Sequence, residues 1–202
     1  MVIGKSFAWG HMGKTGGDAT WRLFQCVPDL VERAHDPTDP AKHRRFVEEN
    51  VQGKTLVLNL RRLPSLTLSY VNHARFHGLG PDQPAGTEIT PEEALEELRA
   101  ERVIRNHTDR GNLTIHRWLR MEHLREDFLE FVSTLRPLTS AEVQAVRAVT
   151  TKKPMPYDHD PRTFFSPDQI VQLYENSPTW ARYEREVYGD LLLPEAEAKA
   201  AW

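Results

Sequence analysis

The stretch Ala8–Thr20, AWGHMGKTGGDAT, predicts a strand, a glycine-rich turn and the start of a helix. Its first half belongs to Ser6–Met12, SFAWGHM, which is short, apolar and aromatic, as a buried strand is. Asp18 can cap a helix running to about Ala34. A glycine-rich turn between a strand and a helix presents backbone N–H groups and the positive end of the helix dipole to an anion. Lys14 adds a cation, so the stretch predicts an anion-binding loop.

Outward from this loop the chain alternates strands and helices. Thr55–Leu60, TLVLNL, is continuous and apolar, as a central parallel strand covered on both faces is. Thr90 and Glu93 have the spacing of a capping box. We therefore predict an α/β fold with a small, mostly parallel central sheet flanked by helices and a helix-rich C-terminal part. The expected elements are helices at 64–77, 91–106, 125–135, 139–149, 166–176 and 178–188, a strand at 113–121, one domain over 1–190 and a loose tail at 191–202.

Composition limits the possible partners. The 202 residues carry a formal net charge of −3, and the pI is near 6.3. We expect neither nucleic acid nor a membrane as a partner, so an anion site must be local. Cys26 is the single cysteine, which excludes an intrachain disulfide and a thiol metal cluster. No apolar run approaches the ~20 residues that span a bilayer. We expect a cytoplasmic protein without a bound metal.

The loop fits two kinds of nucleotide site. Ala8–Thr15 matches a relaxed triphosphate-binding pattern, a small residue and four others before Gly-Lys-Thr. In that pattern Thr15 ligates magnesium, and an acid at the end of a neighbouring strand holds the water shell of the ion. The neighbouring strand instead continues into Arg61 and Arg62, and Asp18 lies close to the triphosphate position. A nucleotide-dependent kinase remains the alternative interpretation.

Three motifs, in order, resemble those of sulfotransferases that use 3′-phosphoadenosine 5′-phosphosulfate, in particular the carbohydrate-type and bacterial branch. HMGKTGGDAT resembles the phosphosulfate loop of the family, with Lys14 at the position of its lysine. LVLNLRRLPSLTLSYVNHARFHG resembles the element that binds the 3′-phosphate, in which Arg61 ends a strand and Ser69 follows eight residues later on a helix. WLRMEHLREDFLEF resembles a later strand-Glu-x-Leu-helix element, in which Glu122 is structural.

This resemblance implies a P-loop-like sulfotransferase fold and in-line transfer of a sulfuryl group to a hydroxyl of a small-molecule or sugar acceptor, leaving adenosine 3′,5′-bisphosphate and requiring no metal. Lys14 would be catalytic, and His35, between the loop helix and the arginine strand, would be the general base, with His43 as runner-up and Arg62 as a reserve cation. The implied cofactor-binding residues are Gly13, Lys14, Thr15, Gly16, Gly17, Asp18, Ala19, Thr20, Arg61 and Ser69.

Two residues depart from the family pattern. Gly13 replaces a proline, and Asp18 replaces a Ser or Thr whose hydroxyl would face the anion. An acid there weakens anion binding unless it caps the helix and points away, which leaves Thr15 and Thr20 to supply hydroxyls. Asp18 therefore motivates a third interpretation, a non-catalytic nucleotide-binding relative.

Overall fold

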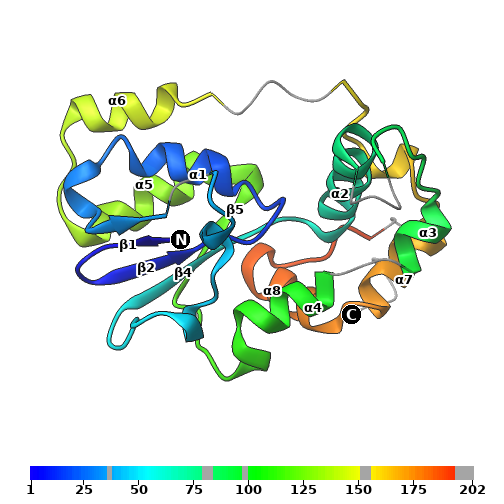
Figure 1. Ribbon diagram of the computed structural model, residues 1–202, viewed down its shortest axis with the longest axis horizontal. Coiled ribbons are helices and arrows are strands. Elements are labelled where there is room, and N and C mark those ends of the chain that lie inside the picture. Colours follow the sequence, from blue (N-terminus) through cyan, green and yellow to red (C-terminus); the bar gives the residue numbers. More distant parts are fainter. Residues whose placement is uncertain (36–37, 79–83, 97–99, 151–155, 194–202) are drawn as a thin grey trace. The chain divides into compact units, whose positions relative to one another are not determined.

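The computed structural model of the chain describes residues 1–35, 38–78, 84–96, 100–150 and 156–193 (Figure 1). Its internal contacts divide the chain into two compact units. The first unit comprises Met1–Leu60 and Arg105–Pro154, and the second comprises Arg61–Ile104 and Met155–Trp202. Each unit is described by itself below.

The first unit is built on a five-stranded sheet in the order β3-β1-β2-β4-β5. β2 pairs in parallel with β4, and β4 with β5, whereas β1 is antiparallel to both β2 and β3. The sheet is therefore mixed, and the parallel arrangement holds only for β2, β4 and β5. Its strands are β1 Val2–Ile3, β2 Phe7–Gly10, β3 Arg33–Ala34, β4 Thr55–Leu60 and β5 Arg117–Arg120.

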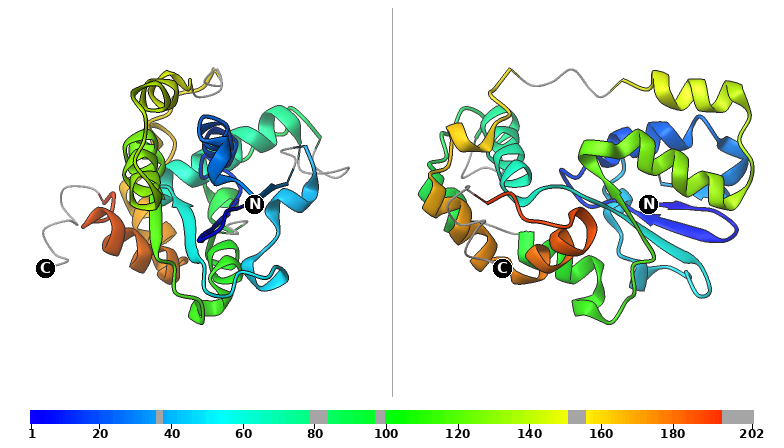
Figure 2. Two further views of the ribbon diagram at one scale, coloured as in Figure 1. Left: turned by 90° about the vertical axis from the view of Figure 1, so that its left-hand side faces the viewer. Right: turned by 180° about the vertical axis from the view of Figure 1, so that it is seen from behind.

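Successive side chains of a strand point to opposite faces of the sheet, and the side chains on one face of this sheet pack against helices. Trp9, Val57 and Leu119 belong to one buried cluster with α1 (Gly17–Phe24) and α5 (Leu124–Leu135). Figures 1 and 2 show both helices on the same side of the sheet, with α6 (Ser140–Ala148) beyond them. On the opposite face Gly10 lies against Leu58 and the ring of Phe46.

The helix after the loop differs from the prediction at both ends. α1 ends at Phe24 and not near Ala34, because Pro28 lacks an N–H and begins a short 3₁₀ turn, η1 (Pro28–Leu30), before β3. The N-cap residue is Gly16, with φ of 90°, so the prediction that Asp18 caps the helix is wrong. Asp18 instead lies in the first turn of α1, where a negative charge favours the helix dipole.

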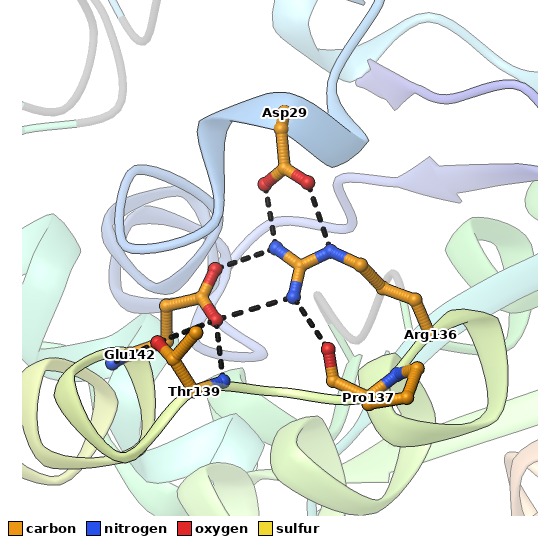
Figure 3. A network of polar contacts seen from close by, with 5 residues as sticks. All are labelled: Asp29, Arg136, Pro137, Thr139 and Glu142. Carbon is orange, nitrogen blue, oxygen red and sulfur yellow. Dashed lines mark hydrogen bonds and ion pairs between the residues drawn. The ribbon is translucent and has the colours of Figure 1, made fainter.

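A polar network fixes the start of α6 (Figure 3). The Arg136 guanidinium donates to Asp29 at 2.6 and 2.8 Å and to Glu142 at 2.5 and 3.2 Å. Glu142 and Thr139 form a capping box. The hydrogen bonds from Arg136, with those from Thr139, lower the pKa of Glu142 to about 2, and Arg136 also lowers the pKa of Asp29. Because both folded pKa values are depressed, the network stabilises the fold above the ordinary carboxyl pKa and is lost as the pH falls toward 2.

The second unit is helical. α7 packs against α2, α3 and α8. The capping box predicted at Thr90 and Glu93 is present, but 97–99 lie outside the described residues, and α3 and α4 stand where one helix was predicted. α2, α7 and α8 match their predicted ranges within a residue or two. The helices are α2 Leu63–His77, α3 Pro91–Glu96, α7 Pro167–Glu175, α8 Pro178–Tyr188 and α4 Ala100–His107, of which residues 100–104 belong to this unit.

The structure does not describe residues 151–155 or most of the predicted C-terminal tail. Of the tail predicted at 191–202, the structure describes only 191–193, where the Leu192 N–H donates to the Tyr174 hydroxyl at 3.0 Å. η6 (Pro161–Thr163) follows residues 151–155 in the chain. No helix in the described part of the chain combines the length and the apolar character needed to span a bilayer.

Candidate functional site

The predicted loop joins β2 to α1 in the first unit, at the carboxyl end of a parallel strand. Lys14 has φ of 62° and Gly16 has φ of 90°, so both lie in the left-handed region. A non-glycine residue in that region costs of order 1 kcal/mol or more and persists only where its surroundings hold it. The strained backbone conformation therefore occurs at Lys14, the residue that the sequence predicts to contact an anion.

Close packing accounts for two of the loop glycines. A Cβ on Gly16 would overlap the Met121 sulfur, and a Cβ on Gly17 would overlap the ring of His11. The backbone at these two positions therefore requires glycine whether or not a ligand approaches. These contacts also bring η5 (Met121–His123) and the end of β2 against the start of α1.

Asn59 on β4 holds the loop. Its Nδ2 donates to the Thr15 carbonyl at 2.9 Å and to the Thr20 hydroxyl at 2.7 Å. Its Oδ1 accepts from the indole N–H of Trp9 at 2.8 Å. Asn59, Thr15 and Thr20 are all fully buried, so each of these bonds forms away from water, where an unmade bond is costly. We call these contacts of Asn59 the Asn59 bracket.

The two threonine hydroxyls are used inside the loop. Thr15 donates to the Met12 carbonyl at 2.9 Å, and Thr20 donates to the Gly16 carbonyl at 3.2 Å. The sequence suggested both hydroxyls as anion contacts, but in this arrangement they shape the backbone. The remaining candidate anion donors of the loop are the N–H groups of the first turn of α1, as at any helix N-terminus, and the Lys14 side chain.

A basic segment packs beside the loop and offsets its acidic residue. η2 (Pro40–His43) is capped by Asp39, whose carboxylate accepts from the Ala41 N–H. Lys42 Nζ lies 3.5 Å from Asp18 Oδ1. The negative charge that was expected to oppose an anion therefore has a cation beside it. This pair could not be predicted from local sequence, since 24 positions separate the two residues.

His43 reaches the same region. Its Nδ1 lies 3.0 Å from the His11 carbonyl oxygen, and the two imidazole rings are 4.6 Å apart. Burial and the neighbouring His43 lower the pKa of His11 to about 3, and burial also lowers the pKa of the more exposed His43. With Nδ1–H donated to a carbonyl, His43 would keep a lone pair on Nε2, as a general base does.

His35, the predicted base, follows β3 at the same edge of the sheet. β3 runs parallel to β2 on the far side of β1, so the strand ends put His35 two strands away from the start of the loop. Its Nε2 is buried and lies 3.4 Å from Glu49 Oε1. Glu49 also pairs with Arg33 and Arg44. The Nε2 atom of His35 is therefore not accessible to an acceptor hydroxyl.

Arg61 and Ser69 belong to the second unit. Arg61 is half-buried before α2, and its carbonyl accepts from the indole N–H of Trp180 at 3.0 Å. Ser69 is buried on α2. Arg62, the reserve cation, pairs with Glu184 and Asp190 at 3.2 and 2.6 Å and lies 4.1 Å from the Tyr188 ring centre. The predicted residues thus divide between the units, with the loop, His35 and His43 in the first.

A pocket of about 200 Å³ lies in the first unit between α1 and the start of α5. Its apolar side chains come from α1, from the residues around Met121 and from Val149, and Glu122, Arg125 and Glu126 supply charge. The exposed Glu122 lines this pocket, although the sequence assigned it a structural role. Within the described ranges, no group of three or more His, Cys, Asp or Glu side chains is placed to hold a metal ion.

Comparison of the chain with protein-family models, curated proteins and solved structures found no match.

Proposed function

We propose that this chain is a sulfotransferase that moves a sulfuryl group from 3′-phosphoadenosine 5′-phosphosulfate to a hydroxyl of a small-molecule or sugar acceptor. The observation that carries the proposal is the conformation of the loop between parallel strand β2 and α1. In this loop Lys14 has a left-handed backbone conformation, and the Asn59 bracket binds the neighbouring Thr15 and Thr20. Arg61, directly after β4, and Ser69 on α2 would bind the 3′-phosphate. The ion pair between Lys42 and Asp18 removes the main objection to anion binding at the loop.

The kinase alternative fits the loop less well. It requires the Thr15 hydroxyl to ligate magnesium, yet this hydroxyl is buried and donates to Met12. It also requires an acid on the neighbouring strand, and the side chain that reaches the loop from β4 is the neutral amide of Asn59. A neutral amide at this position suits a reaction that needs no metal.

In the proposed reaction the acceptor oxygen attacks sulfur in line. The new oxygen–sulfur bond forms as the bond from sulfur to the 5′-phosphate oxygen breaks, and adenosine 3′,5′-bisphosphate leaves with the bonding electrons. Lys14 would stabilise the charge that grows on the leaving oxygen, together with N–H groups at the start of α1. A protein base would take the acceptor proton.

For this base the geometry favours His43 over His35. The contact from His43 Nδ1 to the His11 carbonyl selects the tautomer that accepts a proton on Nε2, and the lowered pKa keeps the ring neutral at neutral pH. Lys42, one position before His43, lies against Asp18 in the loop helix. His35 Nε2 faces Glu49 instead.

His43→Gln is expected to lower kcat by about 10²–10⁴, the usual contribution of general acid–base catalysis. His35→Gln, at the same edge of the sheet, is the matched control and should retain most of the activity. The wild-type rate should fall as the pH drops below the lowered pKa of His43, because the protonated ring cannot accept a proton. The reverse ranking of the two variants would return the base to His35.

A thermal-shift titration tests the function itself. Adenosine 3′,5′-bisphosphate at 100 times its Kd should stabilise the fold by about 2.7 kcal/mol, or roughly 5–10 °C for a chain of this size. ATP with magnesium should give a much smaller shift. A larger shift with ATP and magnesium would favour the kinase, and no shift with either ligand would remove the anion-loop assignment. Binding without transfer to any acceptor would indicate the non-catalytic relative.

A further inference from the structure

Helix α8 contacts three consecutive residues, Arg61 to Leu63, within the second unit, through the backbone of Arg61 and Leu63 and the side chain of Arg62. The Trp180 indole N–H donates to the Arg61 carbonyl at 3.0 Å. Four residues later, and so on the same face of α8, Glu184 accepts from Arg62 at 3.2 Å and from the Leu63 backbone N–H at 2.8 Å. Three consecutive residues are therefore fixed by two side chains of one helix.

This attachment is buried. Trp180 and Glu184 are both fully buried, and Glu184 also accepts from the Tyr174 hydroxyl at 2.7 Å. The bond to Leu63 satisfies an N–H in the first turn of α2, which would otherwise need another partner. Since Glu184 takes that N–H, a phosphate near the start of α2 would depend on side chains such as those of Arg61 and Ser69.

We propose that Trp180 and Glu184 are positioning residues that hold Arg61 for a nucleotide 3′-phosphate and so set the preference for 3′-phosphorylated nucleotides. This inference rests on the proposed function and extends it to the C-terminal helix. A backbone that is already fixed at Arg61 does not have to be ordered when a phosphate binds, which lowers the entropic cost of the contact. Release of the Arg61 carbonyl lets the backbone move, and the contact with the 3′-phosphate weakens selectively.

The test measures the 3′-phosphate preference, defined as the Kd of adenosine 5′-phosphate divided by the Kd of adenosine 3′,5′-bisphosphate. Trp180→Phe removes the donor to Arg61 and retains an aromatic ring. Thr179→Val is the matched control, because Thr179 is adjacent on α8 and its hydroxyl bonds to Glu101 on α4. We expect Trp180→Phe to lower the preference about fivefold or more, and Thr179→Val to leave it within about twofold of wild type.

A second pair keeps the inference testable if Trp180→Phe does not fold. Glu184→Gln retains an acceptor for the Leu63 N–H and should keep the preference, whereas Glu184→Ala should lose it. An equal loss in Trp180→Phe and Thr179→Val would overturn the positioning role, since a general loosening of α8 would then explain both. Equal affinities of the wild-type protein for the two nucleotides would overturn the 3′-phosphate site itself, and the proposed function with it.

Discussion

Lys14→Ala should lower kcat/KM for sulfuryl transfer by about 10²–10³, the loss typical of removing one group that stabilises transition-state charge. The affinity for adenosine 3′,5′-bisphosphate should fall about tenfold to a hundredfold, since a charge-assisted hydrogen bond contributes about 1.5–3 kcal/mol. The larger effect on transfer than on binding follows because the charge on the leaving oxygen grows in the transition state. Single-turnover kinetics and calorimetric titration measure the two quantities.

Two controls separate charge from conformation. Lys14→Gly removes the same cation but suits the left-handed backbone, so it should be more stable than Lys14→Ala while losing as much activity. Lys5→Ala removes an exposed lysine in the turn between β1 and β2 and should change neither quantity. Full nucleotide affinity in Lys14→Ala would contradict the assignment of the loop as an anion site.

The elements with strong local patterns were predictable. The continuous apolar run of β4 matched its predicted range, and the capping box predicted at Thr90 and Glu93 is present before α3. β1 and β3 were missed because two residues give no periodicity to read. α1 was predicted too long because the apolar residues after Phe24 resemble a continued helical stripe, although Pro28 stops it.

The loop was predictable, and the contacts that support it were not. Asn59 was treated only as part of the apolar run Thr55–Leu60, although a single polar residue in a buried strand must find partners. Those partners, Trp9 and Thr15, lie 50 and 44 positions away in the chain. Lys42 is one of several cationic residues in its part of the sequence, and only the folded structure shows that it lies beside Asp18. The strand, turn and helix around the loop were therefore predictable from local sequence, whereas the side chains that shape the loop come from distant parts of the chain.

Asn59→Asp should destabilise the first unit by about 3 kcal/mol at pH 8, because a carboxylate cannot donate to the Thr15 carbonyl and its charge is buried. Burial and the facing carbonyl raise the pKa of the new carboxyl in the folded state above its unfolded value. The variant is therefore most stable below the unfolded pKa, near 4, and loses stability as the pH rises through the folded pKa. Urea unfolding from pH 4 to pH 8 measures this trend.

The controls identify which property of the side chain matters. Asn59→Leu cannot bond to Trp9 or Thr15, so it should be similarly destabilised with no added dependence on pH. Asn50→Asp makes the same chemical change at an exposed position of the first unit and should stay within about 0.5 kcal/mol of wild type. If Asn59→Asp kept wild-type stability at pH 8, the hydrogen bonds of the Asn59 bracket would not contribute to the stability of the first unit.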